Sequence, residues 1–192
     1  MAEKPKVSIA VFVSGVGSNL EALLHAERSD DWPARIALVV SDNPDSLAIA
    51  KARDADRPVC ARRPREFTDK AAYEQAILVK LYEYNVEWIF LAGYMRLIGP
   101  TLLQAYEGKI VNIHPSLLPA FPGRDAIGDA MAAAVEKTGV TVHYVDEGID
   151  TGAIIAQEIV PIDTGMTKDQ LAQRIHRVEH GLYPRVVRQL LS

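Results

Sequence analysis

The chain has 192 residues, and 48% of them are hydrophobic, which suffices for the core of one domain. Its 21 Lys and Arg against 25 Asp and Glu give a formal charge of −4, which argues against general binding to nucleic acid or to an anionic membrane. The single cysteine, Cys60, excludes an intramolecular disulfide and a thiolate metal cluster. Residues 1–13 contain no apolar segment long enough for a signal peptide or a membrane span, so we expect a cytoplasmic protein.

Short apolar runs alternate with helical patterns along the chain. Strands that are apolar on both faces and separated by helices indicate a parallel sheet covered on both sides. Later in the chain, two strands lie close enough in sequence to pair as an antiparallel ribbon. We therefore expect an α/β, Rossmann-like, mostly parallel sheet with helices on both faces and antiparallel strands near the C-terminal part. The expected strands are 7–13, 36–40, 87–92, 109–114, 138–145 and 153–161, and the expected helices are 20–26, 46–55, 69–84, 126–136 and 167–191.

A glycine-containing turn, Ser14-Gly15-Val16-Gly17-Ser18-Asn19, joins the first strand to its helix. Ser18 or Asn19 can cap that helix, and unpaired N–H groups at its N-terminus favour an anion. The dinucleotide fingerprint requires a third glycine where Leu20 stands, and the Lys-Ser/Thr ending of a P-loop is missing. The turn therefore favours a monophosphate over NAD or ATP, although an ordinary tight turn remains an alternative.

Two polar residues, Asn112 and His114, stand in a strand that is otherwise apolar. Because they are two positions apart, they point to the same side, at the carboxyl end where open α/β sheets bind ligands. The Asn112 amide can donate to a carbonyl oxygen or an oxyanion, and the His114 imidazole can stabilise charge or move a proton near neutral pH. The alternative is a pair of strand-end residues whose hydrogen bonds the backbone satisfies.

Two loops downstream are candidates for completing a site with this strand. Residues 114–123 contain three prolines, at 115, 119 and 122, which make the loop stiff and suited to binding. Residues 145–152 form an acidic turn that includes Asp150, a carboxylate that could orient His114 and stabilise its protonated form. An acidic hairpin tip without such a role is the other interpretation.

Two further patterns point to different chemistry. His176-Arg177-Val178-Glu179-His180 matches the inverted zinc-peptidase pattern, but no spacing marks a third protein ligand. Two Asp-Thr-Gly tripeptides begin at Asp150 and Asp163, as in aspartic proteases, but those enzymes take one copy from each of two similar β-rich halves. We therefore expect no metal site and no protease.

In chain order, Ser14-Gly15-x-Gly17-Ser18-Asn19, Asn112-x-His114-Pro115-Ser116-Leu117-Leu118-Pro119 and Asp150-x-Gly152 resemble the 10-formyltetrahydrofolate-dependent formyltransferase superfamily. The resemblance covers essentially the whole chain, and the phosphate turn favours the branch that acts in purine biosynthesis. It implies a single formyltransferase domain, 1–192, with a phosphate-binding half at about 1–105 and a folate-binding and catalytic half at about 106–192.

The resemblance also implies roles for individual residues. The formyl donor would be 10-formyltetrahydrofolate, a co-substrate rather than a tightly bound cofactor, and the acceptor would be the amine of glycinamide ribonucleotide. Asn112, His114 and Asp150 would be catalytic, with Asn112 holding the formyl oxygen and His114 donating a proton. The substrate phosphate and ribose would contact Gly17, Ser18, Asn19 and Glu179. The folate would contact Lys70, Met95, Arg96, Leu97, Ile98, Asn112, Asp146, Glu147, Gly148 and Ile149.

Some details remain open within this resemblance. Lys70 stands where some relatives have arginine, so it keeps the charge but loses the planar fork. His143 either supports the site from behind or is a strand histidine without a role in it. Nearby alternatives are a 10-formyltetrahydrofolate deformylase and a methionyl-tRNA formyltransferase, which would need an additional domain, and a non-catalytic nucleotide-binding module. We expect no nucleic-acid or membrane partner, and a monomer or homodimer.

Overall fold

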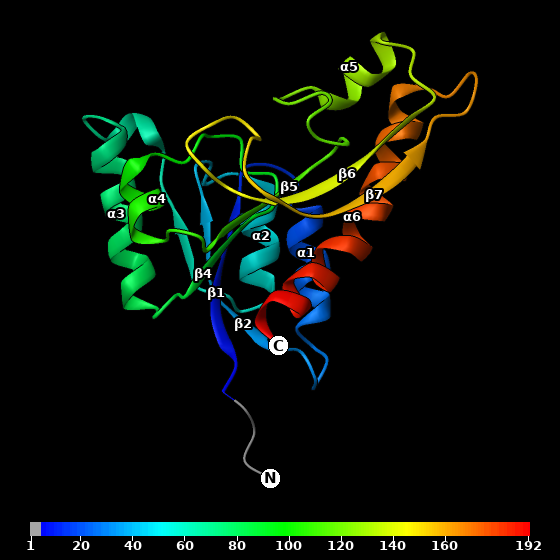
Figure 1. The fold of residues 1–192 in the computed structure, drawn as a ribbon. Coiled ribbons are helices and arrows are strands. Elements are labelled where there is room, and N and C mark those ends of the chain that lie inside the picture. The colour runs from blue at the N-terminus through cyan, green and yellow to red at the C-terminus, as the bar shows by residue number, and fades with distance from the viewer. Residues whose placement is uncertain (1–4) are drawn as a thin grey trace.

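A computed structural model describes residues 5–192. Its centre is one seven-stranded sheet in the order β3-β2-β1-β4-β5-β6-β7, and all pairs from β3 to β5 are parallel. Strands β6 and β7 join antiparallel, as expected from the sequence. Figure 1 shows the sheet with the carboxyl ends of its parallel strands uppermost. The α/β class with a mostly parallel sheet is therefore confirmed.

The elements follow the expected alternation. The strands are β1 Val7–Val13, β2 Ala34–Ser41, β3 Val59–Ala61, β4 Trp88–Leu91, β5 Ile110–His114, β6 Lys137–Tyr144 and β7 Ile154–Pro161. The helices are α1 Ser18–Ala26, α2 Leu47–Asp54, α3 Lys70–Glu83, α4 Pro100–Ala105, α5 Ala126–Ala132 and α6 Lys168–Leu191, with a 3-10 turn at Pro64–Glu66.

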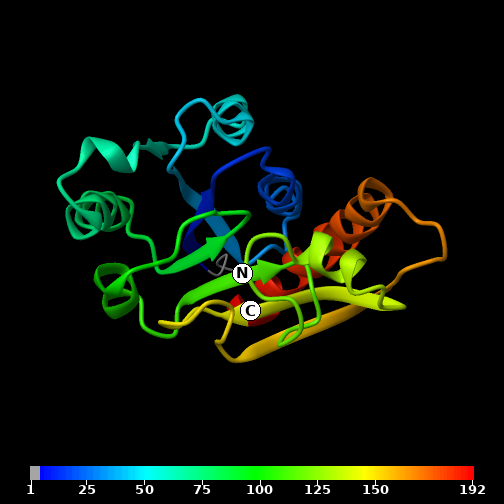
Figure 2. The same ribbon diagram turned by 90° about the horizontal axis from the view of Figure 1, so that it is seen from above.

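Two apolar cores lie on opposite faces of the sheet. Alternate residues of β1 serve each face: Ile9 and Val11 pack with α1, α2 and α6, whereas Ala10 and Phe12 pack with α3 and α4. The view from above separates α3 and α4 on one side from α1 and α6 on the other (Figure 2). A two-sided core explains why the parallel strands are continuous apolar runs rather than alternating ones.

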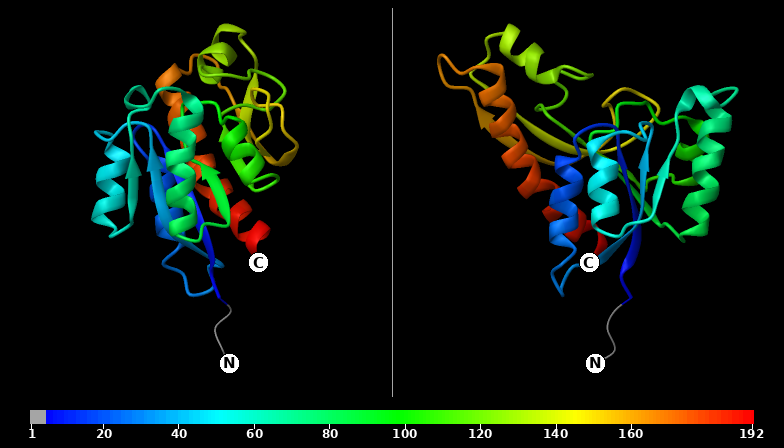
Figure 3. Two further views of the ribbon diagram at one scale, coloured as in Figure 1. Left: turned by 90° about the vertical axis from the view of Figure 1, so that its left-hand side faces the viewer. Right: turned by 180° about the vertical axis from the view of Figure 1, so that it is seen from behind.

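Helix α6 is the longest element and lies along α1, where Figure 3 shows the two side by side. It begins with a capping box in which the Thr167 hydroxyl accepts from Gln170 N–H and the Gln170 side chain accepts from Thr167 N–H. The helix continues through Pro184 to Leu191. No helix among residues 5–192 is long and apolar enough to cross a membrane.

The structure differs from the sequence expectations at four places. Strand β3 and helix α4 were not expected, because three and six residues are too short to show a period. Helix α5 stops at Ala132 rather than 136, since Ala134 adopts φ 50° and Lys137 already pairs with Pro161 in the sheet. The residue before α1 is Gly17 in the left-handed conformation, so neither Ser18 nor Asn19 caps it.

Candidate active site

The structure brings Asn112, His114 and Asp150 together. Asn112 and His114 lie at the carboxyl end of β5, and the Asp150 carboxylate approaches from the loop between β6 and β7. His114 Nδ1 lies 3.4 Å from Asp150 Oδ2. These three residues, with His143, form the group that we call the catalytic cluster.

Both ring nitrogens of His114 face protein groups, and His114 is only 4% exposed. The Nε2 atom lies 2.9 Å from the carbonyl oxygen of Phe121, which can only accept, so Nε2 carries a hydrogen. The other nitrogen, Nδ1, faces the Asp150 carboxylate. His114 is therefore held between a carbonyl acceptor at Nε2 and a carboxylate at Nδ1.

Asp150 is held by its backbone as well as by its neighbours. Its φ of 55° lies in the left-handed region, which Asp tolerates better than most residues. The Gly123 N–H donates to Asp150 Oδ2 over 2.8 Å. Burial alone raises the pKa of this carboxyl, but the His143 imidazole, the Gly123 N–H and the His114 charge outweigh burial and lower the pKa. Asp150 is therefore a carboxylate at neutral pH.

His143 belongs to the same group, although the sequence left its role open. Strand pairing sets it opposite Asn112, and the Asn112 Nδ2 lies 3.2 Å from His143 Nε2. The other ring nitrogen, Nδ1, donates to the Tyr144 carbonyl over 2.7 Å. His143 thus orients the Asn112 side chain and lies 3.6 Å from Asp150 Oδ1.

A buried hydroxyl holds the proline-rich loop against the sheet. Thr141 is fully buried; its Oγ1 donates to the Ser116 carbonyl over 2.7 Å and accepts from the Leu118 N–H over 3.1 Å. The Gln157 amide donates to the same Oγ1 and to the Leu118 carbonyl. Because this loop supplies the Phe121 carbonyl and the Gly123 N–H, the network positions the partners of His114 and Asp150. Sequence reasoning missed Thr141, since a threonine in a strand carries no motif.

The phosphate turn is built from backbone. Gly17 has φ 74°, and a Cβ placed there would lie 2.6 Å from the Cβ of Ala48 on α2, so both conformation and space require glycine. The Ala48 N–H donates to the Gly15 carbonyl over 3.0 Å, which fixes the turn against α2. No side chain caps α1. Its first N–H groups are therefore available to an anion.

Two of the residues predicted to bind the substrate contact each other. The Asn19 Nδ2 donates to Glu179 Oε2 over 3.0 Å in a buried contact, so this side chain faces α6, and the Asn19 Oδ1 is buried without a partner among residues 5–192. Burial raises the pKa of Glu179 to about 7, although the Asn19 hydrogen bond opposes that rise. One turn later, the Tyr183 hydroxyl contacts the carbonyls of Leu91 and Val111 at 2.8 and 3.1 Å.

The predicted folate residues fall into two groups. Lys70 and Arg96 line a cavity of about 320 Å³ together with Phe67 and Tyr73, and the Arg96 guanidinium lies 5.8 Å from the Tyr73 ring centroid. Ile98 differs, because its side chain is buried in the core with α3 and α4.

The other group lies on two exposed loops. Met95 and Leu97 are about half exposed, and the Met95 N–H donates to Ser14 Oγ over 2.9 Å, which joins this loop to the phosphate turn. The loop from Asp146 to Ile149 is exposed, and Asp146 Oδ1 accepts from Gly148 N–H and from the Thr151 hydroxyl. Its side chains are therefore on the surface, where a ligand can reach them.

The two rival patterns do not form their sites. Among residues 5–192, no three His, Cys, Asp or Glu side chains are grouped so that they could hold a metal ion, and Glu179 of the zinc pattern faces Asn19. The carboxylates of the two Asp-Thr-Gly tripeptides have separate partners, since Asp163 binds Arg174 and Asp150 faces His114. Neither arrangement supports a peptidase.

Comparison with known proteins gives the class to which this fold and cluster belong. A family model described as "Formyl transferase" matches residues 7–187. The chain therefore belongs to the formyl transferase family.

Individual relatives share the whole length of the chain. It is 55% identical over 183 residues to the phosphoribosylglycinamide formyltransferase of Bacillus subtilis (strain 168). This match covers 95% of this chain and 94% of that protein. The crystal structure of glycinamide ribonucleotide transformylase 1 from Geobacillus kaustophilus is 56% identical and superposes with a TM-score of 0.95 over 98% of this chain and 100% of that one. The phosphoribosylglycinamide formyltransferase from Bacillus halodurans gives 49% identity and a TM-score of 0.94, covering 96% and 95% of the two chains. These similarities confirm the formyltransferase fold.

Proposed function

We propose that the chain transfers the formyl group of 10-formyltetrahydrofolate to the amine of glycinamide ribonucleotide. The products are formylglycinamide ribonucleotide and tetrahydrofolate, and the reaction belongs to de novo purine biosynthesis. The observation that carries the proposal is the catalytic cluster, which lies in a chain that is 55% identical to the Bacillus subtilis formyltransferase. The folate is consumed as a co-substrate, the location is cytoplasmic, and the chain acts as a monomer or homodimer.

The proposed chemistry begins at the formyl carbon. The amine nitrogen attacks this carbon, a new C–N bond forms, and the formyl oxygen becomes an oxyanion. Asn112 is partly exposed and donates an N–H to that oxygen, while the His114 ring stabilises the charge. One such preorganised donor contributes about 3 kcal/mol to transition-state stabilisation.

Collapse of the intermediate requires two proton movements. The amine loses one proton, and the folate N10 gains one as its bond to the formyl carbon breaks, so the protons balance. Asp150, ionised because its pKa is lowered, accepts the proton from the amine directly or through water, and the adjacent His114 returns a proton to the leaving N10. The two groups are 3.4 Å apart, and they restore their protonation states by exchanging a proton.

The two substrates occupy opposite sides of the cluster. The phosphate binds at the N–H groups of Gly17, Ser18 and Asn19, and the ribose hydroxyls bind at the Glu179 carboxyl on α6. Glu179 is only 5% exposed, and burial favours its protonated carboxyl, which can both donate to and accept from a ribose hydroxyl.

The folate lies across the exposed loops. Its anionic end binds Lys70 and Arg96 at the cavity of about 320 Å³. Met95, Leu97 and the loop from Asp146 to Ile149 contact the pterin and formyl region, whereas Ile98 supports that wall from the core.

A spectrophotometric assay of tetrahydrofolate release from a 10-formylfolate donor tests the proposed function. Release should depend on added glycinamide ribonucleotide. Equal release with and without this amine would instead select a deformylase that uses water as acceptor. Absence of release in both cases would contradict a formyl-transfer role for the cluster.

A further inference from the structure

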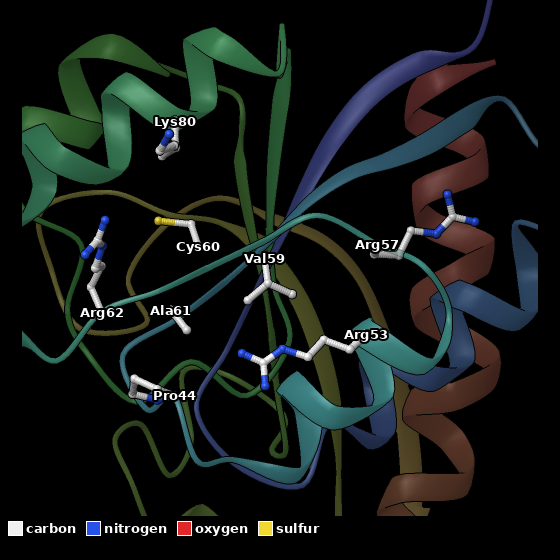
Figure 4. A pocket seen from close by; sticks show the side chains of 8 residues that line it. All are labelled: Pro44, Arg53, Arg57, Val59, Cys60, Ala61, Arg62 and Lys80. Carbon is white, nitrogen blue, oxygen red and sulfur yellow. The ribbon is translucent and has the colours of Figure 1, made fainter.

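A second cavity lies along the outer edge of β3, at the end of the sheet away from the catalytic cluster. Its volume is about 470 Å³, and none of the residues assigned to the active site lines it. Figure 4 shows the side chains that line it. They are Pro44, Arg53, Arg57, Val59, Cys60, Ala61, Arg62 and Lys80.

The lining of this edge cavity is strongly basic. Four of its eight residues are Arg or Lys, and within residues 5–192 no carboxylate lines it, although the chain as a whole carries a charge of −4. Arg57 pairs with Glu27 at 3.1 Å and Lys80 with Glu83 at 2.6 Å. Two cations are therefore compensated locally.

The other two cations, Arg53 and Arg62, have no carboxylate within 4.0 Å in the part of the chain that the structure describes. Figure 4 shows the Arg53 guanidinium beside Val59, whereas the Arg57 guanidinium points away from the strand. A guanidinium fork binds phosphate oxygens in pairs.

The edge of the strand adds backbone donors to the cavity. Pro58 O accepts from Val39 N–H, and Arg62 N–H donates to Ser41 O, so the backbone groups of these alternate residues face β2. The N–H groups of Val59 and Ala61, which lie between them, therefore face outward, because β3 is the last strand of the sheet. Within residues 5–192 neither N–H has a hydrogen-bond partner outside the sheet. Unpaired N–H groups are suited to phosphate oxygens.

The remaining wall is apolar. Pro44, Val59 and Ala61 offer carbon surface, whereas the neutral Cys60 thiol lies on the opposite face of β3. Burial raises the pKa of this thiol despite the nearby positive charges of Arg62 and Lys80. A thiol that stays protonated at neutral pH is a poor nucleophile and contributes packing rather than reactivity.

We propose that the edge cavity binds a small phosphate-bearing molecule of the nucleotide class. The phosphate lies at the edge of β3 against the outward N–H groups, with Arg53 on the face of Val59 and Arg62 on the face of Cys60, and the planar base packs on the apolar wall. A volume of about 470 Å³ falls within the range of small-molecule sites, about 300 to 1,000 Å³. The site is separate from the catalytic cluster, so it does not depend on the proposed function.

Amide chemical shifts of the ¹⁵N-labelled protein test this site directly. Adenosine monophosphate should shift the Val59 and Ala61 amides in a saturable way, and it should bind more tightly than inorganic phosphate because the base contacts the wall. Shifts confined to residues 14–19 would place all binding at the phosphate turn and overturn the proposal. Equal affinity for adenosine monophosphate and inorganic phosphate would overturn the proposal that the ligand is of the nucleotide class.

Variants then separate specific binding from general attraction of anions. Replacing both arginines, Arg53→Gln with Arg62→Gln, should weaken adenosine monophosphate binding at the β3 amides by at least about tenfold, because two charge-assisted contacts are lost. The matched control is Arg28→Gln, an exposed arginine outside the cavity, which should leave the affinity unchanged. An unchanged affinity in the double variant, or an equal loss in the control, would contradict the site. Formyl-donor turnover of each variant reports that the fold is intact.

Discussion

The phosphate turn and the catalytic cluster lie at the same end of the sheet, but they are built differently. The turn depends on the backbone, with Gly17 in the left-handed region and packed on Ala48. The cluster depends on side chains from β5, β6 and a loop, each fixed by hydrogen bonds. A backbone site tolerates few changes of shape, whereas a side-chain site tolerates few changes of chemistry. Substitutions that change shape should therefore affect the phosphate turn most, and substitutions that change chemistry should affect the catalytic cluster most.

The largest effect is expected at the cluster. His114→Ala or Asp150→Asn should lower kcat by about 10² to 10⁴-fold, because each removes a proton-transfer or charge-stabilising group. Asn tolerates the φ of 55° at position 150, so the fold should persist. Steady-state rates and circular dichroism check both points. The exposed residues His25 and Asp30 provide matched controls, His25→Ala and Asp30→Asn, and near-normal turnover in both cluster variants would contradict the mechanism.

Thr141→Val keeps the shape of the side chain but removes its hydroxyl. It therefore tests whether the hydrogen bonds of Thr141 hold the proline-rich loop beside the catalytic cluster. The valine leaves the Leu118 N–H without its acceptor and the Ser116 carbonyl without its donor, which should cost about 3 kcal/mol of unfolding free energy. A loosened loop should also lower kcat by about tenfold or more. Urea unfolding and kinetics measure both, and Thr141→Ser, which keeps the hydroxyl, should restore most of each. A fully active, stable valine variant would show that the network does not position the loop.

Gly17→Ala tests the backbone site. The added Cβ meets Ala48 at 2.6 Å and the φ of 74° disfavours any side chain, so we expect a loss of about 3 kcal/mol in stability. The KM for the phosphorylated substrate should rise more than kcat falls. Gly15→Ala is the matched control for stability, because a Cβ there meets nothing within 4 Å and its φ is not positive. Equal stability losses in the two variants would refute the packing argument.

At Glu179, which contacts Asn19 beside the phosphate turn, the expected effect is a change in how stability depends on pH. Its pKa is raised by burial from 4.5 to about 7, so the folded state binds this proton more tightly than the unfolded state does. The native state therefore loses stability as pH rises between 4.5 and 7, by about 3 kcal/mol in all. Glu179→Gln should remove this loss and be more stable than the parent at pH 8, with the difference shrinking towards pH 4.5.

Urea unfolding of the parent and the glutamine variant across this pH range measures the effect. The control is Glu66→Gln, an exposed residue, which should leave the pH dependence of stability as it is. Parallel stability curves for the parent and Glu179→Gln would mean that the folded protein does not retain the extra proton.

Much of this arrangement could be predicted from the sequence, and the exceptions have physical reasons. The period-two polar pair at 112 and 114 and the acidic turn at 150 identified the cluster, because a polar residue in a two-sided buried strand is unusual. The roles of His143 and Thr141 depend on which strand pairs with β5 and in which register, and local sequence does not encode that.

The direction of the Asn19 side chain was equally hidden. Asn19 and Glu179 are 160 positions apart, so their contact is a product of α6 packing on α1. Likewise, Ala134 ends α5 by taking a left-handed conformation that alanine does not favour, and tertiary pairing of the next strand overrides the helical pattern.

Helix α6 contacts both sides of the site within little more than one turn. Glu179 binds Asn19 behind the phosphate turn, and Tyr183 contacts the carbonyls of Leu91, the last residue of β4, and Val111 within β5. Neither α1 nor the β4–β5 pair can unfold locally without disturbing α6. Amide hydrogen exchange in α1, β4 and α6 is therefore expected to proceed through one shared opening with a common free energy. Loss of either contact should accelerate exchange at all three elements together.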